Sequence, residues 1–412
     1  MTVSASGSTR GPVPARTGTA AEGWAAPRHH YLDNLKVIVI AAIIAIHGVL
    51  GYAGTTEAWS YTSVREVTLS VVTEGLLVIV IGPFGMFVIA LLFLVAGMLT
   101  LPSYERHGPS AYVSSRLLRL GVPFAAFVLL IQPTVIYALE HPLGESPGSY
   151  LAEYLGEERQ LDSGPLWFVG VLLIFSLGYA GWRALRGDGV QPAGETAAGG
   201  RLAGMQVRPI SMRHLWVIVA VVAPMSFALR LVWAYGSDSW FFDLNFWQWP
   251  VCLAMFGLGI AASRQEWLER TPADLHRSCR TVTVVAGAAM AVLLFTAGAL
   301  DIVEDAMGGW GLPALAFAVV EPTLSVFGSV WLLGVAQRRL DWPMRWGPAL
   351  SRSAYGAFIL QGIFLIGIAL ALREVSLPAE VKALLVATGG VAASFGTAWL
   401  LATRVRWLGR VL

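Results

Sequence analysis

The chain contains ten stretches that are long enough and apolar enough to cross a membrane as helices. A spanning helix needs roughly 20 predominantly apolar residues, because the hydrocarbon core of a bilayer is about 30 Å thick. Inside lipid, backbone polar groups must bond within the protein, so the ten stretches predict an all-α, polytopic membrane helical bundle of about ten transmembrane helices. The predicted spans lie at about residues 32–52, 75–99, 117–139, 165–183, 214–235, 244–262, 281–300, 313–336, 350–372 and 380–402.

The composition of the chain favours the same class. Of its 412 residues 56% are hydrophobic and 13% are charged, whereas about a quarter of the residues in a soluble domain are charged. The net charge of +2 does not suggest a nucleic-acid partner. Cys252 and Cys279 fall outside the predicted outer loops and have no histidine at ligand spacing, so neither a disulfide framework nor a metal site is predicted. The expected environment is the lipid bilayer of the cell (plasma) membrane.

The second predicted span is the most irregular. Its apolar run extends from Val67 to Thr100 and is broken at Gly82-Pro83. Proline inside a helix removes a hydrogen bond and favours a kink. The segment is therefore either one kinked helix or a helix followed by a re-entrant piece.

The basic residues predict which way the helices run. If the N-terminus lies inside, most of the 28 Lys and Arg residues fall in inner segments. Cytoplasmic loops carry an excess of Lys and Arg, so both termini are predicted to be cytoplasmic. Arg230 falls within a helix, near its outer end. The outer loops hold only Arg65, Arg159, Arg373 and Lys382.

The polar segments predict the domain organisation. Residues 1–30, rich in Ser, Gly, Thr, Ala and Pro, are expected to be a disordered cytoplasmic tail. Residues 31–403 form the membrane domain, which contains a flexible cytoplasmic linker at 184–212. Residues 404–412 are a short basic cytoplasmic tail. The chain shows no internal repeat, which gives no support to an inverted-repeat transporter.

The first predicted span carries a polar stripe. Lys36 and His47 are eleven residues apart, close to three helical turns, so they share a face and are separated by about 16 Å along the axis. Asp33 lies on nearly the same stripe. Such a face should point into the bundle or a wet cavity. Lys36 and Asp33 could simply anchor the helix at the interface, and His47 could be a polar tie between helices or a general base, since histidine titrates near neutral pH.

Four motifs occur in order along the chain. A D-x-x-[basic]-x10-H pattern runs from Asp33 to His47, and ALLFLVAGMLT precedes LPSYERHGPSAYVSSRLLRLGVPF. GPLWFVGVLLIFSLGY and LSRSAYGAFILQG follow. Over about residues 30–402 this ordered set resembles the acyltransferase-3 family of integral membrane acyltransferases. The resemblance implies a ten-helix core that moves an acyl group, commonly acetyl, from cytoplasmic acyl-CoA to an extracytoplasmic glycan or other small acceptor.

The resemblance assigns roles to residues of the first and third spans. His47 matches the histidine that is the presumed catalytic base. Lys36 stands where the family has arginine, so the charge is kept but the bidentate fork is lost. Arg116 and Arg119 match an R-x-x-R motif, are expected on one helix face at the cytoplasmic side, and suit the phosphates of CoA. Lys36, Arg116 and Arg119 are thus predicted to bind acyl-CoA, with ordinary positive-inside flanking as the alternative for the two arginines.

Glu321 is the second predicted catalytic residue. It follows Pro313 by eight residues in a helix that enters from outside, so it should lie about 12 Å in, at a depth similar to that of His47. A charge there costs about 2.5–3.5 kcal/mol on insertion scales. His47 is one candidate partner, since a carboxylate could orient the imidazole. A purely structural hydrogen bond is the alternative.

Four further residues are predicted to bind substrate: Asp33, Trp167, Phe168 and Gln361. Trp167 and Phe168 match the family's LWF motif, although interfacial anchoring would also explain them. Gln361 stands where many members carry a histidine. Glutamine forms hydrogen bonds but does not exchange protons near pH 7, so any proton-transfer role of that histidine is absent or moved here.

Three functions remain open from the sequence. The first is an O- or N-acyltransferase that uses acetyl-CoA or another acyl-CoA and no metal, because CoA carries the activated thioester. The second is a proton-coupled transporter or flippase of the same topology, with His47, Glu321 and Asp33 as a proton relay. The third is a lapsed enzyme kept as a membrane scaffold or sensor.

Overall fold

The computed structural model describes residues 29–54, 61–62, 64–140, 148, 161–187, 209–237, 242–265 and 267–405. Every regular element in these residues is a helix. The predicted N-terminal tail, most of the linker at 184–212 and most of the C-terminal tail lie outside the described residues. The elements are α1 (His30–Leu50), α2 (Val71–His107), α3 (Pro109–Arg116), η1 (Leu117–Gly121), α4 (Val122–Ala126), η2 (Phe127–Ile131), α5 (Gln132–Glu140), η3 (Gly164–Leu166), α7 (Trp167–Leu185), α8 (Met212–Arg230), η4 (Phe246–Gln248), α9 (Trp249–Ser263), α10 (Ala273–Ala299), α11 (Val303–Met307), α12 (Leu312–Arg339), α13 (Gly347–Leu372) and α14 (Ala379–Arg404).

Ten helices in the described residues are long and apolar enough to cross a membrane. They overlap all ten predicted segments, which confirms the predicted all-α membrane bundle. The third span is a continuous helical run from Pro109 to Tyr137, built from α3, η1, α4, η2 and α5. The protein is therefore a multi-pass membrane protein, and the cytoplasmic location of its termini stays a prediction from the basic residues.

Helix α2 resolves the ambiguity of the second span. It runs unbroken through Pro83 and Pro102 for 37 residues, which corresponds to about 55 Å of length. No re-entrant piece interrupts it. Its length exceeds the roughly 30 Å of a hydrocarbon core, so its ends extend past the apolar layer. Ser70 caps its start by accepting a hydrogen bond from the backbone N–H of Thr73.

Two glycines allow α2 and α9 to lie very close together. A Cβ placed on Gly97 of α2 would collide with the backbone carbonyl of Phe256, and one on Gly259 of α9 would collide with that of Leu94. Small residues at such contacts let helix backbones approach in membranes, where no hydrophobic effect drives helices together. This contact fixes the spacing of the two helices.

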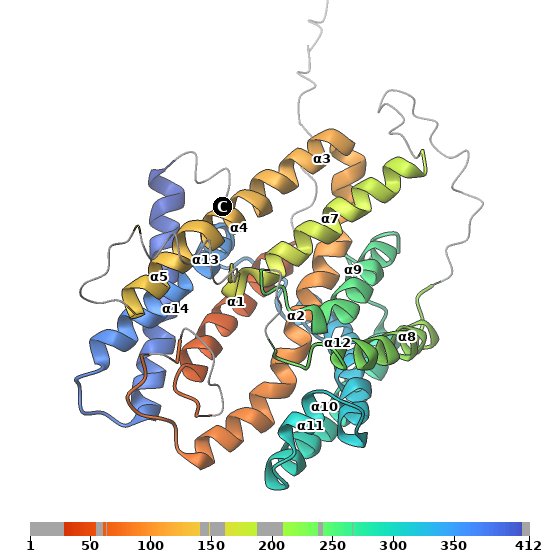
Figure 1. Ribbon diagram of the computed structural model, residues 1–412. Helices are drawn as coiled ribbons and strands as arrows, with labels where there is room; N and C mark the ends of the chain where they lie inside the picture. The colour runs from red at the N-terminus through yellow and green to blue at the C-terminus, as the bar shows by residue number, and fades with distance from the viewer. Residues whose placement is uncertain are drawn as a thin grey trace, which may run out of the picture.

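The helices form two neighbouring groups (Figure 1). Helix α1 packs against α13 and α14, while α2 packs against α9, α10 and α12, and α12 packs also against α8. The third span and α7 cross the upper part of the view in Figure 1. Helix α1 also contacts α12, so the two groups meet at α1 and α12.

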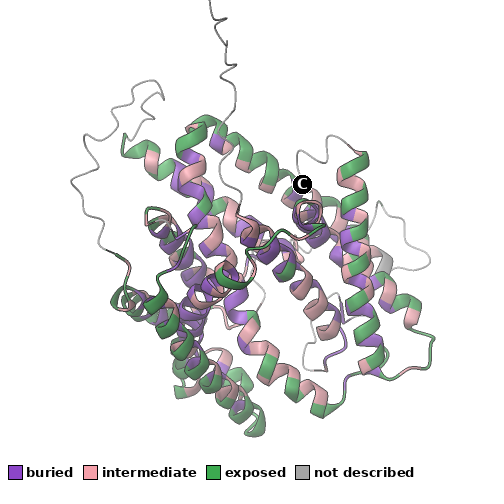
Figure 2. Ribbon diagram, turned by 180° about the vertical axis from the view of Figure 1, so that it is seen from behind, coloured by how far each residue is buried: buried purple, intermediate pink, exposed green. Residues whose placement is uncertain are grey.

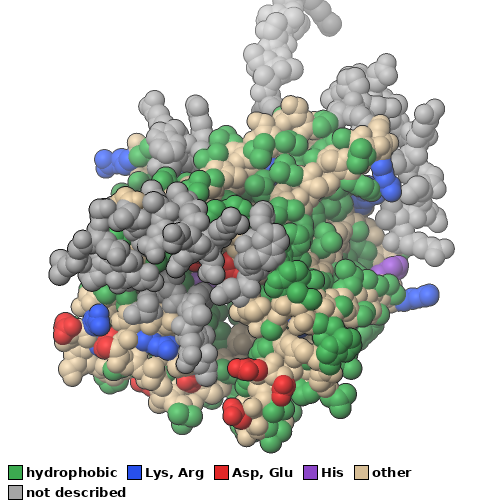
Figure 3. Space-filling model, viewed as in Figure 1, with side chains coloured by type: hydrophobic (Ala, Val, Ile, Leu, Met, Phe, Trp, Pro, Cys, Tyr) green, Lys and Arg blue, Asp and Glu red, His purple; other side chains and the backbone are tan. Residues whose placement is uncertain are grey.

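The outer faces of the spans are apolar and exposed. Figure 2 shows buried residues along the inner faces and exposed residues along the outer faces of the helices, and Figure 3 shows hydrophobic side chains over much of the visible flank. Exposed apolar side chains are what lipid requires, whereas a soluble protein rarely shows such large patches. Examples on three different spans are Val221, Val285, Phe295 and Leu384.

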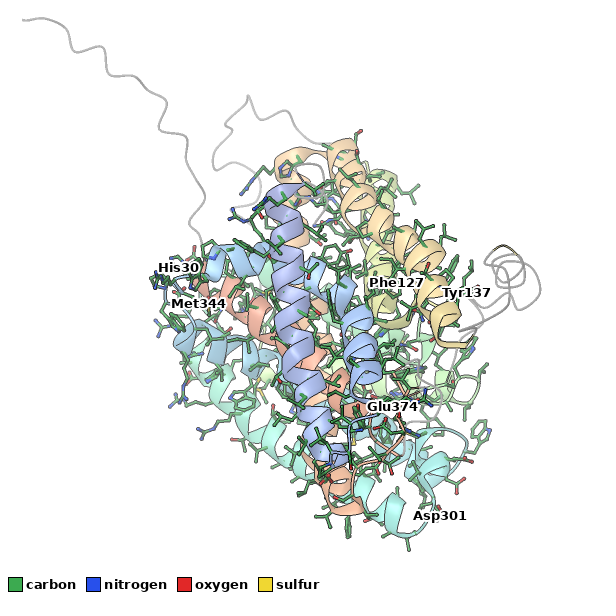
Figure 4. The ribbon with its side chains drawn as sticks, turned by 90° about the vertical axis from the view of Figure 1, so that its left-hand side faces the viewer. His30, Phe127, Tyr137, Asp301, Met344 and Glu374 are labelled. Carbon is green, nitrogen blue, oxygen red and sulfur yellow. The ribbon has the colours of Figure 1, made fainter. Side chains whose placement is uncertain are left out.

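Successive connections alternate between the two ends of the bundle. His30, at the start of α1, lies beside Met344, in the connection from α12 to α13 (Figure 4). Glu374, between α13 and α14, and Asp301, between α10 and α12, lie toward the opposite end. Below, the first end is called the Met344 end and the second the Glu374 end. Lys36, one of the three predicted acyl-CoA residues, and His47 therefore belong to different halves of α1.

Candidate functional site

The first turn of α1 is tied to the connection between α12 and α13. The backbone N–H of Tyr31 donates to Oδ1 of Asp341 at 3.2 Å. Nδ2 of Asn34 donates to the carbonyl oxygens of Leu340 and Trp342, both at 2.8 Å. Because Asn34 is buried, these bonds are shielded from solvent. They fix the start of the helix that carries the polar stripe.

Lys36 lies near the Met344 end, within electrostatic range of Asp33 and Arg119. Oγ of Ser351 in α13 donates to Oδ1 of Asp33 at 2.7 Å. The charges of Asp33 and of Arg119 both act on the Lys36 ammonium, which is half-buried. Lys36 thus lies within electrostatic range of Arg119, a second predicted acyl-CoA residue, and of Asp33.

Arg116 has a different environment from Arg119. Its guanidinium carbon lies 4.9 Å from the centre of the Tyr112 ring. The next five residues, Leu117–Gly121, form a π-helix, in which i→i+5 bonding takes more residues per turn than an α-helix. Arg116 and Arg119 therefore lie further apart around the axis than the predicted shared face of a regular helix. Arg119 is exposed and acts on Lys36, while Arg116 is half-buried against Tyr112.

His47 is bonded to Gln361 inside the bundle. Nδ1 of His47 lies 2.9 Å from Oε1 of Gln361 in α13, whose side chain is fully buried. The Tyr61 ring lies against the imidazole, with ring centres 5.7 Å apart and planes 32° apart. Two residues far apart in sequence thus enclose the histidine from α13 and from the segment after α1.

Phe168 is linked to the surroundings of His47 through its contact with Phe358. The two rings meet edge to face with their centres 5.2 Å apart, and the carbonyl oxygen of Phe358 accepts a hydrogen bond from Nε2 of Gln361 at 3.0 Å. Trp167, the first residue of α7, is half-buried and packs against the hydrophobic core. Of Trp167 and Phe168, the two predicted substrate-binding residues of the LWF motif, Phe168 is the one that contacts the neighbourhood of His47.

The carboxylate of Asp162 acts electrostatically on Tyr61. Its Oδ2 accepts from Nε2 of Gln132 at 2.5 Å and its Oδ1 from the backbone N–H of Gly164 at 2.6 Å. Burial of the Tyr61 hydroxyl, and then the negative charge of Asp162, raise the pKa of Tyr61 well above its usual range. Tyr61 therefore stays neutral and protonated beside the imidazole at physiological pH.

The structure does not bring Glu321 to His47. Glu321 is fully buried and its Oε2 accepts from Nη2 of Arg230 at 3.1 Å. Its Oε1 accepts from Oγ of Ser325 at 3.3 Å. The expected cost of a buried carboxylate is thus offset by Arg230 in α8 and by a hydroxyl one turn further along α12. A similar depth did not make Glu321 and His47 neighbours, because they lie on helices that face different parts of the bundle.

Two aromatic rings lie beside the guanidinium of Arg230. Its central carbon lies 5.0 Å from the ring centre of Tyr235 and 5.1 Å from that of Phe317. Burial, and then the charge of Glu321, raise the pKa of Tyr235. In the described part of the chain, Nε and Nη1 of Arg230 and Oγ of Ser226 are buried without a hydrogen-bond partner.

Residues 29–403 match a family model described as an acyltransferase domain, that of the acyltransferase-3 family. The match covers nearly the whole chain. The chain belongs to the acyltransferase-3 family. Comparisons with curated proteins and with solved structures give no match.

The predicted acyltransferase-3 residues occupy three places in the bundle. Asp33, Lys36 and Arg119 gather near the Met344 end, His47 and Gln361 bond each other further along α1, and Glu321 lies apart with Arg230. Among the residues that the structure describes, no three His, Cys, Asp or Glu side chains are grouped as metal ligands would be. The acyltransferase-3 histidine contacts two neutral side chains, those of Gln361 and Tyr61.

Sequence reasoning missed Tyr61, Asp162 and Arg230 as neighbours of the predicted site residues. Arg230 carried a usable signal, because a charge inside a predicted span implies a buried partner. Tyr61 and Asp162 lie in connections between spans, where neither hydropathy nor helical period indicates a contact. The contact of Tyr61 with the histidine, and the effect of Asp162 on Tyr61, come only from the way the spans pack.

Proposed function

We propose that this protein transfers an acyl group, acetyl in the first instance, from cytoplasmic acyl-CoA to a hydroxyl or amine of an extracytoplasmic acceptor. Membership of the family makes it a membrane acyltransferase. One observation supports the finer proposal: a single helix carries Lys36, which interacts with Arg119, and His47, which bonds Gln361. About 16 Å of helix separates the two, so α1 connects a basic site to a histidine site.

The basic site would hold the donor. Lys36 and Arg119 place two positive charges near the Met344 end, where the excess of Lys and Arg predicts the cytoplasm. Charge-assisted hydrogen bonds from these groups suit the phosphates of CoA. Arg116, stacked on Tyr112, is available to a larger part of the same molecule. The pantetheine arm would then extend along α1 toward His47.

His47 would carry the proton in the transfer step. The acceptor hydroxyl or amine gives its proton to the imidazole as its oxygen or nitrogen attacks the thioester carbon. The carbon–sulfur bond breaks, and the CoA thiolate leaves and recovers the proton from the imidazolium. General base catalysis of this kind contributes typically 10²–10⁴-fold.

The acceptor is proposed to be a glycan or another cell-surface molecule at the plasma membrane. His47 lies in the half of α1 next to the Glu374 end, which the same charge rule predicts to face outside. An acceptor that arrives from there would meet the histidine without crossing the bilayer. This places donor and acceptor on opposite sides of one helix bundle.

The contacts of Glu321 and Asp33 do not favour the proton relay that the transporter hypothesis requires. That relay needed His47, Glu321 and Asp33 in sequence, whereas Glu321 bonds Arg230 and Ser325 and Asp33 bonds Ser351. A lapsed enzyme would also have little reason to keep a half-buried histidine in a hydrogen bond. Acyl transfer is the function that the arrangement supports best.

The test is acetyl-CoA binding and turnover by the purified protein in detergent. The wild type is compared with His47→Ala and with the double variant Arg116→Ala/Arg119→Ala. Loss of turnover with retained binding is expected for His47→Ala, and weakened binding for the double variant. A folded wild type that binds no acyl-CoA would refute the proposal.

Matched controls separate these roles from general damage. His107 is an exposed histidine whose Nδ1 bonds the carbonyl of Ser103 in its own helix, so His107→Ala should leave turnover unchanged. Arg345 is exposed and stacks on Trp346, so Arg345→Ala should leave binding unchanged. Equal losses in the controls and the site variants would contradict the assignment.

A further inference from the structure

Gln361 makes two hydrogen bonds that together fix how its amide is turned. One amide atom lies 3.0 Å from the carbonyl oxygen of Phe358, one helical turn earlier in α13. The other lies 2.9 Å from Nδ1 of His47. A backbone carbonyl only accepts hydrogen bonds, so the atom facing Phe358 must be the NH₂ group. The carbonyl oxygen of the amide therefore faces the histidine.

This orientation determines which imidazole nitrogen carries the hydrogen. The amide oxygen of Gln361 only accepts, so Nδ1 of His47 must be the donor. A neutral imidazole has one N–H, and the other nitrogen then holds the lone pair. In neutral His47 the basic nitrogen is consequently Nε2.

The arrangement around Gln361 restrains it from turning over. Its side chain is fully buried and its α-carbon lies mid-helix in α13. If the amide flipped, NH₂ would face Nδ1 and the amide oxygen would face the Phe358 carbonyl, which places two acceptors together without a hydrogen. An unmade buried hydrogen bond costs about 1–3 kcal/mol. The Phe168 ring against Phe358 further immobilises this turn of α13.

We propose that Gln361 is a positioning residue that holds His47 in the Nδ1–H tautomer, so that Nε2 is the nitrogen that takes the acceptor proton. The assignment of the base rests on the proposed acyl transfer, whereas the tautomer is a property of the resting protein. Gln361 thus does the orienting work that a carboxylate does in a Ser-His-Asp triad, with a neutral group in place of a charged one.

A neutral orienting group keeps its bond throughout the transfer. When Nε2 receives the acceptor proton, Nδ1–H remains a donor and the Gln361 oxygen remains its acceptor. The acceptor oxygen forms its bond to the thioester carbon, the carbon–sulfur bond breaks, and the proton on Nε2 passes to the thiolate sulfur. Gln361 itself neither gains nor loses a proton, which is what glutamine chemistry requires near pH 7.

The first experiment reads the tautomer directly. Protein labelled with ¹⁵N-histidine is compared with its His47→Ala variant by NMR in detergent, so that the missing signals identify His47. Nitrogen shifts that show a protonated Nδ1 and an unprotonated Nε2 in the neutral ring are expected. A neutral His47 with its hydrogen on Nε2 would overturn the proposal, whatever the protein's activity.

The second experiment changes Gln361. Gln361→Leu removes both hydrogen bonds at similar size, and it should lower kcat for acetyl transfer or acetyl-CoA turnover by about 10-fold, since one hydrogen bond is worth up to about a factor of ten. The KM for acetyl-CoA should stay within about twofold, and the His47 signals should lose the single Nδ1–H form. Gln361→Glu keeps an acceptor toward Nδ1 and should retain the tautomer and part of kcat.

The matched control is Gln337→Leu. Gln337 lies in α12, where its amide bonds the carbonyl of Trp267 and the backbone N–H of Thr271, so the same substitution removes comparable bonds elsewhere. It should leave the His47 signals unchanged. A Gln361→Leu protein with wild-type kcat and a raised KM for the acceptor would show a substrate-binding role and overturn the positioning role. A wild type that shows the expected tautomer but no turnover would refute the acyl transfer alone.

Discussion

Arg230 and Glu321 form an ion pair that is almost wholly shielded, with Nη2 of the arginine 3.1 Å from Oε2 of the glutamate and side-chain exposures of 3% and 0%. The pair joins α8 to α12, and its guanidinium lies beside the rings of Tyr235 and Phe317, which also contact each other. Two buried charges are costly unless each compensates the other. The contact therefore accounts for an arginine and a glutamate within membrane spans without a role in the chemistry at His47.

Removal of Arg230 should destabilise the bundle strongly. Arg230→Ala leaves Glu321 buried without its cation, and breaking a buried pair in this way costs about 3–5 kcal/mol. The double variant Arg230→Met/Glu321→Leu removes both charges and should recover most of that loss. The measurement is thermal unfolding in detergent. Arg213→Ala, on the exposed start of α8, is the control that should change little.

If the double variant unfolds as readily as Arg230→Ala, uncompensated charge is not the cause of the loss. The same double variant also tests Glu321 as a catalytic residue. Since the contacts of Glu321 are with Arg230 and Ser325, the folded double variant should keep acetyl-CoA turnover. Loss of turnover in well-folded protein would restore Glu321 to the chemistry.

Because α2 and α9 are in close contact, adding a single methyl group at Gly97 should destabilise the protein strongly. Gly97→Ala would drive a Cβ into the carbonyl of Phe256, and overpacking of this kind costs typically about 1–3 kcal/mol. Gly85→Ala, on the same helix with nothing within 4 Å of its Cβ, should be neutral or slightly stabilising. The thermal midpoints of the two variants in detergent test this prediction. Equal midpoints would mean that the helices can separate at little cost.

The ion pair of Glu66, at the Glu374 end, should make the stability of the protein sensitive to acid. It pairs with the buried Lys382 of α14. Partial burial raises its pKa, but the hydrogen bond and charge of Lys382 outweigh this and lower the pKa below its usual value. A carboxyl with a depressed folded-state pKa adds stability above its unfolded-state pKa and loses it as the pH falls through the folded-state pKa.

The thermal midpoint of the wild type should consequently fall as the pH drops from about 6 to about 3, past the usual glutamate value. Glu66→Gln should lower the midpoint at neutral pH and flatten this part of the profile. Glu374→Gln, at an exposed glutamate of the same end, should leave both unchanged. A Glu66→Gln profile as steep as that of the wild type would assign the acid step to other groups.

Replacement of Lys36 by arginine should increase the affinity of the protein for acetyl-CoA. Lysine binds phosphate as a point charge, whereas arginine offers a planar fork. Lys36→Arg should tighten acetyl-CoA binding, and Lys36→Met should weaken it by about tenfold, the value of one charge-assisted hydrogen bond. Isothermal titration with acetyl-CoA measures both. Tighter binding by Lys36→Met would exclude Lys36 from the donor site.

The spans of this protein could be predicted because hydropathy over 20 residues depends on lipid alone. Ten apolar runs become ten helices, and Asp33, Lys36 and His47 share the helix on which their spacing placed them. The continuity of α2 could not be decided in advance, since the effect of Pro83 depends on neighbouring helices that satisfy the freed carbonyl.

The partners of the site residues were harder to predict than their depth. The position of Glu321 in its span indicates how far it lies from the membrane surface, but not toward which helix it points. Its bond to Arg230 follows from the packing of α8 on α12. Gln361 could be recognised as a departure from the family pattern, yet its bond to His47 required the contact between α1 and α13.

The π-helix of Leu117–Gly121 makes the placement of the two arginines depend on chain length rather than on residue type. A π turn holds a residue more than the α-helix that flanks it. Deletion of one residue from this segment would let α3 run on as a regular α-helix into α4, with every residue beyond it turned by about 100° relative to Arg116. One backbone unit thus sets the direction in which the helix beyond Arg116 presents its side chains, and a scan that replaces side chains alone would not detect it.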